Sequence, residues 1–171
     1  MNALNLPKPS LIDTAVPANQ RLGKLLGKPI VTEATHPIQP AQGYAGDIAL
    51  ALAHAWWESG AAVMIDVRSH AERDWVGVVP GVAFIPWKLY PGMALNPRFA
   101  SELEALVPKD SAVLFLCRSG VRSIGAALRA QELGYARAYN ILEGFEGDAD
   151  SLQHRNAHNG WRHAGFAWQQ G

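Results

Sequence analysis

From about residue 44 onward, short apolar runs alternate with longer amphipathic stretches. The apolar runs at 61–67, 81–86, 112–117 and 137–141 predict strands, and the run at 61–67 is typical of a strand that is buried on both faces. Helices are predicted at 48–58, 69–75, 98–107 and 123–133, from an amphipathic or small-residue pattern or from residues that favour helix starts. Strands that alternate with helices predict an α/β fold with a mostly parallel sheet covered on both faces.

Polar residues and glycines mark the ends of these predicted helices. Asp47 is the expected cap of the first helix, and Ser69 with Glu72 forms an S-x-x-E capping box at the start of the second. Asn96 is the expected cap of the third helix, and Gly134 ends the fourth. Glu72 is therefore interpreted as a helix cap rather than as a catalytic base.

Prolines are concentrated at the start of the chain. Residues 1–43 hold six of the eleven prolines, each of which removes a backbone donor and disfavours helix in the residue before it. We expect an extended, partly disordered arm over 1–43, in which 22–31 could still add a short helix or an edge strand. A single domain is expected over 44–171, with a loop-rich end after residue 142.

The charge balance excludes some classes of partner. Fifteen Lys and Arg against fifteen Asp and Glu give a formal net charge of zero, which argues against nucleic acid and anionic membranes as partners. No stretch approaches the roughly 20 apolar residues of a membrane span, and the first residues lack the basic start and apolar run of a signal peptide. We expect a cytoplasmic protein, in which thiols stay reduced.

The only cysteine, Cys117, lies where chemistry is expected in such a fold. It ends the most apolar strand, and ligands of open α/β sheets bind at the carboxyl ends of the strands. The next residues enter a helix, where free backbone N–H groups and the helix dipole favour anions. Gly120 permits a tight turn, and Arg118 and Arg122 add positive charge, so the thiolate form should be favoured. A buried, inert cysteine is the alternative, but this combination within seven residues favours a reactive one.

Four segments, in order, resemble the rhodanese homology domain: DVRSHAE (66–72), VPGVAFIP (79–86), LCRSGVRS (116–123) and YNILEGFEG (139–147). The resemblance extends over about 44–168 and implies a three-layer α/β/α fold with a mostly parallel central sheet. It also implies sulfur transfer, in which the cysteine takes sulfane sulfur from a donor such as thiosulfate and becomes a persulfide. That sulfur then passes to cyanide or to a thiol. One departure is that no histidine precedes the Pro-Gly turn, where this chain has Gly77-Val78-Val79.

The resemblance implies roles for individual residues. Cys117 would be the nucleophile and would carry the persulfide. The expected substrate-binding residues are Arg118, Ser119, Gly120, Val121, Arg122 and Ser123. Their backbone N–H groups would stabilise the sulfur, and the two arginines would hold the oxyanion of thiosulfate. Ser123 is equally well explained as a helix cap. Asp66 and Arg68 would border the pocket or, as we favour, form a structural ion pair.

Two other functions remain open from the residues. Phosphatases and arsenate reductases of this fold use a Cys-x5-Arg loop, whereas only four residues separate Cys117 from Arg122 here. The other alternative is an inactive rhodanese module that serves in protein interaction or regulation.

The expected partners are a small sulfur-containing anion as donor and cyanide, a small thiol or a thiol protein as acceptor. No cofactor is expected. A metal at His154, His158 and His163 is not favoured, because these polar histidines lack a recognisable ligand pattern. The stretch Trp87–Pro91 could rim the pocket or pack its loop onto the domain, and Trp161 and Trp168 should anchor the end of the chain.

Overall fold

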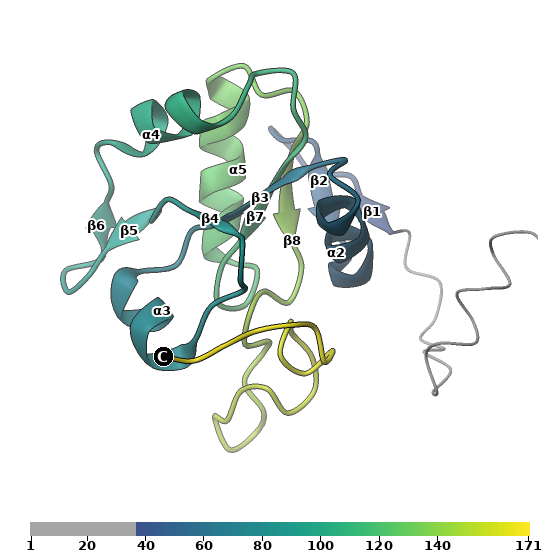
Figure 1. Cartoon of the computed structure of the whole chain (residues 1–171), viewed down its shortest axis with the longest axis vertical. Coiled ribbons are helices and arrows are strands. Elements are labelled where there is room, and N and C mark those ends of the chain that lie inside the picture. Colours follow the sequence, from purple (N-terminus) through teal and green to yellow (C-terminus); the bar gives the residue numbers. More distant parts are fainter. Residues whose placement is uncertain (1–36) are drawn as a thin grey trace, which may run out of the picture. The chain divides into compact units, whose positions relative to one another are not determined.

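The computed structural model describes residues 37–171 (Figure 1). The first strand, β1, lies within the last seven residues of the expected N-terminal arm and pairs with the next strand of the sheet. The sheet therefore begins before Tyr44. The rest of that arm, including the possible helix or edge strand at 22–31, lies outside the described residues.

The described chain folds in the following order of elements. The strands are β1 (Ile38–Gln39), β2 (Gly46–Ile48), β3 (Val63–Asp66), β4 (Ala83–Phe84), β5 (Lys88–Leu89), β6 (Ala94–Leu95), β7 (Val113–Leu116) and β8 (Ala138–Ile141). The helices are α2 (Leu50–Glu58), α3 (His70–Val76), α4 (Phe99–Leu106) and α5 (Arg122–Glu132).

Six of these strands form one sheet in the order β1-β2-β8-β7-β3-β4. All neighbouring pairs are parallel except β1 and β2, which are antiparallel. Strands β5 and β6 form a separate antiparallel hairpin. Strand β7 lies between β8 and β3, so its carboxyl end lies near the middle of the row of strand ends on that side of the sheet.

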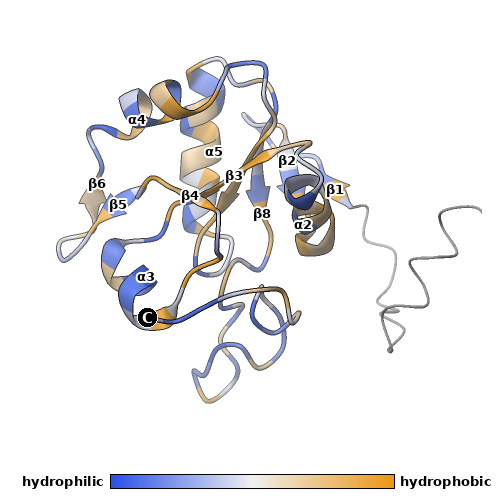
Figure 2. Cartoon of the chain, viewed as in Figure 1, coloured by the Kyte–Doolittle hydropathy of each residue, from blue (hydrophilic) through white to orange (hydrophobic). Residues whose placement is uncertain are grey.

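The two faces of the sheet bury separate apolar cores. Val113 and Phe115 of β7 contribute to a core with α4 and α5. Leu114 and Leu116, which point the other way, contribute to a core with α2 and the C-terminal segment. Figure 2 shows hydrophobic colours along β3, as expected for a strand between two cores. The prediction of a three-layer α/β/α fold is confirmed.

Asp47 does not cap α2, contrary to the prediction. Residues Gly46–Ile48 form β2, which pairs with β8, and α2 begins only at Leu50 without a side-chain cap. The Asp47 carboxylate instead accepts hydrogen bonds from two side chains of the sheet region. A polar residue before an apolar run is compatible both with a helix cap and with a short strand, so the local sequence does not distinguish the two.

The predicted capping box of α3 is confirmed. The Ser69 hydroxyl accepts from the backbone N–H of Glu72, and the Glu72 carboxylate accepts from the backbone N–H of Ser69. Asn96 lies before α4 as expected, but it accepts from the backbone N–H of Arg98 and donates to the carbonyl of Pro86. It therefore fixes the chain entering α4 to the chain leaving β4.

The C-terminal segment packs over the core on the α2 side. Trp161 is fully buried against Trp57 and Phe166, and its indole N–H donates to the carbonyl of Ala167. Trp168 is only partly exposed and meets the ring of Phe145 edge-on. The expectation that these tryptophans anchor the end of the chain is confirmed. No described helix combines the length and the apolar character needed to cross a membrane.

Candidate functional site

Cys117 follows β7 directly and begins the loop that leads into α5. Its side chain is buried, with 1% of the residue exposed. The backbone N–H groups of 118–123 have no hydrogen-bond acceptor among the described residues. They include the first donors of α5, which an α-helix always leaves free. The loop therefore joins a buried sulfur to a row of free N–H donors, an arrangement that suits an anion.

The segment after β8 holds this loop in place. Gly144 has φ of 65° and lies so close that an added Cβ would be 2.5 Å from the carbonyl oxygen of Cys117. The backbone N–H groups of Phe145 and Glu146 donate to the carbonyls of Cys117 and Arg118, at 2.8 and 2.9 Å. These bonds turn the two carbonyls toward 144–146. The loop conformation thus depends on a glycine 27 residues farther along the chain.

A chain of hydrogen bonds leads from the sulfur into the sheet. Ser123 Oγ lies 3.1 Å from Cys117 Sγ and 2.5 Å from Asn140 Oδ1. Asn140 Nδ2 donates to Asp47 at 2.8 Å, which keeps Oδ1 facing Ser123, and the hydroxyl of Tyr44 donates to the same Asp47 oxygen. Burial, with the hydrogen bond to Asp47 and its charge, raises the pKa of Tyr44, so this hydroxyl keeps its proton.

Ser123 was expected either to contact the sulfur or to cap the helix, and these hydrogen bonds favour the contact with the sulfur. The residue lies in the first turn of α5, but α5 has no side-chain cap, and the Ser123 side chain is fully buried. The hydroxyl has one proton for two acceptors. Both acceptors, Cys117 Sγ and Asn140 Oδ1, lie within hydrogen-bond distance, so the hydroxyl is able to donate to either one.

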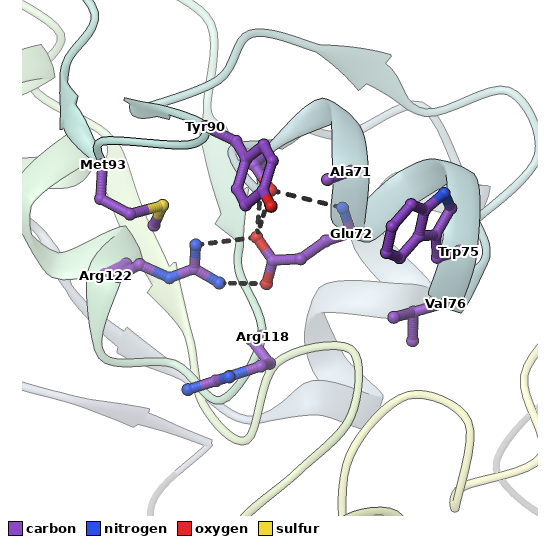
Figure 3. Close-up of a pocket in the computed structure, with 9 residues that line it drawn as sticks. Ala71, Glu72, Trp75, Val76, Tyr90, Met93, Arg118 and Arg122 are labelled. Atoms are coloured by element: carbon purple, nitrogen blue, oxygen red, sulfur yellow. Dashed lines mark hydrogen bonds and ion pairs between the residues drawn. The ribbon is translucent and has the colours of Figure 1, made fainter.

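Arg122 is held by Glu72 (Figure 3). Its two terminal nitrogens lie 2.9 and 2.5 Å from the two carboxylate oxygens, a bidentate ion pair between α5 and α3. Burial raises the pKa of the Glu72 carboxyl, but hydrogen bonds from Arg122 and Ser69 and the charge of Arg122 lower it to about 2. Glu72 is therefore ionised near neutral pH, and it neutralises much of the charge that Arg122 would offer to an anion.

Arg118 differs from Arg122 in this respect. Its side chain is exposed and has no hydrogen-bond or ion-pair partner among the residues that the structure describes. Burial would lower the pKa of the Arg122 guanidinium, whereas Glu72 and the negative charges of Cys117 and Asp66 raise it. Arg122 thus keeps its charge but is paired with Glu72, and the guanidinium of Arg118 is the one free to meet a ligand.

Asp66 and Arg68 form a buried ion pair under the site. Arg68 donates three side-chain hydrogen bonds to the Asp66 carboxylate, the shortest at 2.7 Å, and another to the carbonyl of Gly77. Its guanidinium also lies over the ring of Phe145, 3.9 Å from the centroid. The pair joins the end of β3 to the segment that holds the cysteine loop, which is the structural arrangement that we favoured.

A pocket of about 360 Å³ opens beside the cysteine loop. Figure 3 shows the Met93 side chain next to Arg122, the Tyr90 ring over Glu72, and Trp75 on the far side. The lining residues are Ser69, Ala71, Glu72, Trp75, Val76, Tyr90, Met93, Arg118 and Arg122. Of the stretch Trp87–Pro91, Tyr90 lines the pocket, whereas the Trp87 ring packs edge-on against Phe99 in the core.

Sequence reasoning located the cysteine loop but missed most of what surrounds it. The ion pair of Glu72 with Arg122 joins residues 50 positions apart, and nothing local to either one indicates it. Asn140 gave one usable signal, a polar residue inside an apolar strand run. His154, His158 and His163 are exposed, and in residues 37–171 no three potential metal ligands of the His, Cys, Asp or Glu type come together.

Comparison with known proteins adds a family. Residues 50–150, more than half of the chain, match the family described as the rhodanese-like domain. An uncharacterized protein of Rickettsia prowazekii is 34% identical over 110 residues, which cover 63% of this chain and 83% of the relative. A protein of Allochromatium vinosum named sulfurtransferase is 34% identical over 82 residues, which cover 48% of this chain and 66% of the relative.

Among solved structures, the crystal structure of Rv0390 from M. tuberculosis is similar. The two chains are 43% identical and superpose with a TM-score of 0.67. The match covers 75% of this chain and 99% of that one. This chain therefore shares its fold with that protein over three quarters of its length.

Proposed function

Because the chain belongs to the rhodanese-like domain family, we propose that it is a sulfurtransferase that carries sulfane sulfur as a Cys117 persulfide. The observation that carries this proposal is the position of Cys117, a buried sulfur at the start of a loop whose N–H groups from 118 to 123 are free. Such donors stabilise a negatively charged sulfur without having to reorganise.

The first half of the proposed reaction loads the enzyme. The Cys117 thiolate attacks the outer sulfur of thiosulfate, the S–S bond of thiosulfate breaks, and its electron pair leaves with sulfite. The product is a persulfide whose terminal sulfur carries the negative charge. The free N–H groups of the loop stabilise this charge, and Arg118, with the N–H groups of Arg122 that Glu72 does not occupy, attracts the oxyanion.

The second half of the proposed reaction transfers the sulfur from Cys117 to the acceptor. Cyanide or a thiolate attacks the terminal sulfur, the S–S bond of the persulfide breaks, and its electron pair returns to Cys117. This two-step arrangement is that of covalent catalysis with a substituted enzyme intermediate. Because the chain has one cysteine, the acceptor must come from another molecule. The cytoplasm, where thiols stay reduced, suits this chemistry and is the compartment that we propose.

Turnover of thiosulfate with cyanide tests the proposal. Thiocyanate formation should follow ping-pong kinetics in the wild type and should vanish in Cys117→Ser, since a hydroxyl does not carry sulfane sulfur. Ser111→Ala, a change at the turn before β7, is the matched control and should keep the wild-type rate. Thiocyanate production that persists in Cys117→Ser would refute the role of this cysteine.

A further inference from the structure

The pocket beside the cysteine loop is larger and more apolar than thiosulfate requires. Its volume of about 360 Å³ is within the range of about 300–1,000 Å³ found for sites that bind small organic molecules. Thiosulfate has five heavy atoms and binds through charge and hydrogen bonds. The loop N–H groups and Arg118 supply these, so the rest of the pocket has no use in binding this anion.

Exposed apolar side chains gather around this pocket. Trp75 is 76% exposed, Tyr90 63% and Met93 37%, and all three line it. They come from α3 and from the turn between β5 and β6 (Figure 3). Val76, also of α3, adds a further apolar side chain to the lining. A concentration of apolar surface beside one pocket indicates a site for an apolar group, whereas single exposed residues do not.

Three charged side chains line the pocket, and within residues 37–171 only that of Arg118 has no partner. Glu72 and Arg122 neutralise each other through their bidentate pair. Arg118 has no described partner and lines the pocket from the loop. The pocket thus offers apolar walls and one unpaired positive charge, that of Arg118, the residue that follows Cys117.

We propose that this pocket binds the organic part of the sulfur acceptor, a small thiol that carries an aromatic or other apolar group and one carboxylate. The apolar group packs between Trp75, Tyr90 and Met93, and the carboxylate meets Arg118. The acceptor's thiolate then attacks the terminal sulfur of the Cys117 persulfide. The S–S bond breaks, its electron pair stays on Cys117, and the acceptor leaves as a persulfide. This inference rests on the proposed function.

The experiment measures only the second half of the proposed reaction, the transfer of sulfur from the Cys117 persulfide to the acceptor. The protein is first loaded with sulfur by thiosulfate, and the remaining thiosulfate is removed. It is then mixed, at the same pH in each case, with one of three thiols: mercaptomethylbenzoate, benzyl mercaptan or mercaptopropionate. These carry the aryl group and the carboxylate, the aryl group only, and the carboxylate only. The loss of the persulfide is measured as a function of thiol concentration, and cyanide serves as an acceptor that does not use the pocket.

The expected result is a preference that depends on the pocket walls. Burial of about 40 Å² of apolar surface is enough for about a fivefold change in affinity, so mercaptomethylbenzoate should half-saturate at a concentration at least about fivefold lower than mercaptopropionate. Trp75→Ala and Met93→Ala should each remove most of this preference and leave discharge by cyanide unchanged. Leu152→Ala is the matched control, because Leu152 is exposed and lies outside the pocket.

The possible failures are distinguishable. If the wild type forms no persulfide, the proposed function fails and this inference fails with it. If cyanide discharges the persulfide normally but the three thiols react alike, only the acceptor site is refuted. A preference for the aryl thiol that remains in both Trp75→Ala and Met93→Ala also refutes the acceptor site.

Discussion

Glu72 serves two elements with one carboxylate. It closes the capping box of α3 through Ser69, and it pairs with Arg122 at the start of α5. The first role follows from four consecutive residues, whereas the second requires the fold to bring α3 beside the cysteine loop. The carboxylate therefore links the stability of α3 to the position of an arginine in the site.

Glu72 should make the stability of the wild-type protein depend on pH in a defined way. Its pKa of about 2 in the folded protein lies below the ordinary 4.5, so its contribution is complete above pH 4.5 and is lost as the pH falls toward 2. Glu72→Gln should lower the free energy of unfolding by about 1–2 kcal/mol near pH 7, because the pair is partly solvated. Urea unfolding across this range measures the difference, which should shrink below pH 4.5.

The matched control is Glu132→Gln. Glu132 pairs with Arg129 on the exposed side of α5, and its removal should change the free energy of unfolding by less than about 0.5 kcal/mol. A wild-type advantage over Glu72→Gln that stays constant from pH 7 to pH 2 would contradict the assigned ion pair.

At the scale of the elements, the segment that follows β8 packs directly against the cysteine loop. Gly144 approaches Cys117 and its neighbours so closely that a methyl group would overlap three backbone atoms of the loop. The loop carbonyls are fixed by donors from the same segment. The shape of the cysteine loop is thus determined jointly by β7 and by the chain after β8.

Gly144→Ala should displace the loop and reduce sulfur transfer at least about tenfold, since small misplacements of reacting groups have large effects on rate. Gly60→Ala is the matched control. Gly60 has a similar φ of 73° but open space around it, so both variants share the backbone penalty of roughly 1–2 kcal/mol and only one meets the loop. Equal activity in the two variants would show that this contact does not shape the site.

How much could be predicted also differs between elements. The strands β3, β7 and β8 and the helices α3 and α5 were predicted because each has a strong pattern of its own. Strands β1 and β2 were missed because two or three residues carry no pattern, and their stability comes from pairing with β8 and with each other. The same holds for the site. The loop from Cys117 to Ser123 could be predicted because it is a continuous stretch of sequence, whereas its contacts with Glu72 and Asn140 could not, because they depend on the order of the strands in the sheet.

At the scale of the whole molecule, the C-terminal segment completes one of the two cores. Trp161 is fully buried between the aromatic rings of α2 and Phe166, and Gln169 pairs with Val78 beyond α3. The segment therefore contributes to a core that also includes Leu116, the residue before Cys117.

Trp161→Ala should lower the free energy of unfolding by about 3–5 kcal/mol, the usual effect of removing a large buried aromatic side chain. Trp75→Ala removes the same side chain from an exposed position and should change stability by no more than about 0.5 kcal/mol. Urea unfolding monitored by circular dichroism compares the two. Similar losses in both variants would mean that the C-terminal segment does not belong to the core.

The central claim is that Cys117 carries a transferable sulfur. The most direct measurement is the intact mass of the protein as purified, after thiosulfate, and then after cyanide. We predict a mass gain of one sulfur atom after thiosulfate, its removal by cyanide, and no gain in Cys117→Ser. A wild-type mass that thiosulfate leaves unchanged, or a sulfur adduct that still forms in Cys117→Ser, would contradict the account.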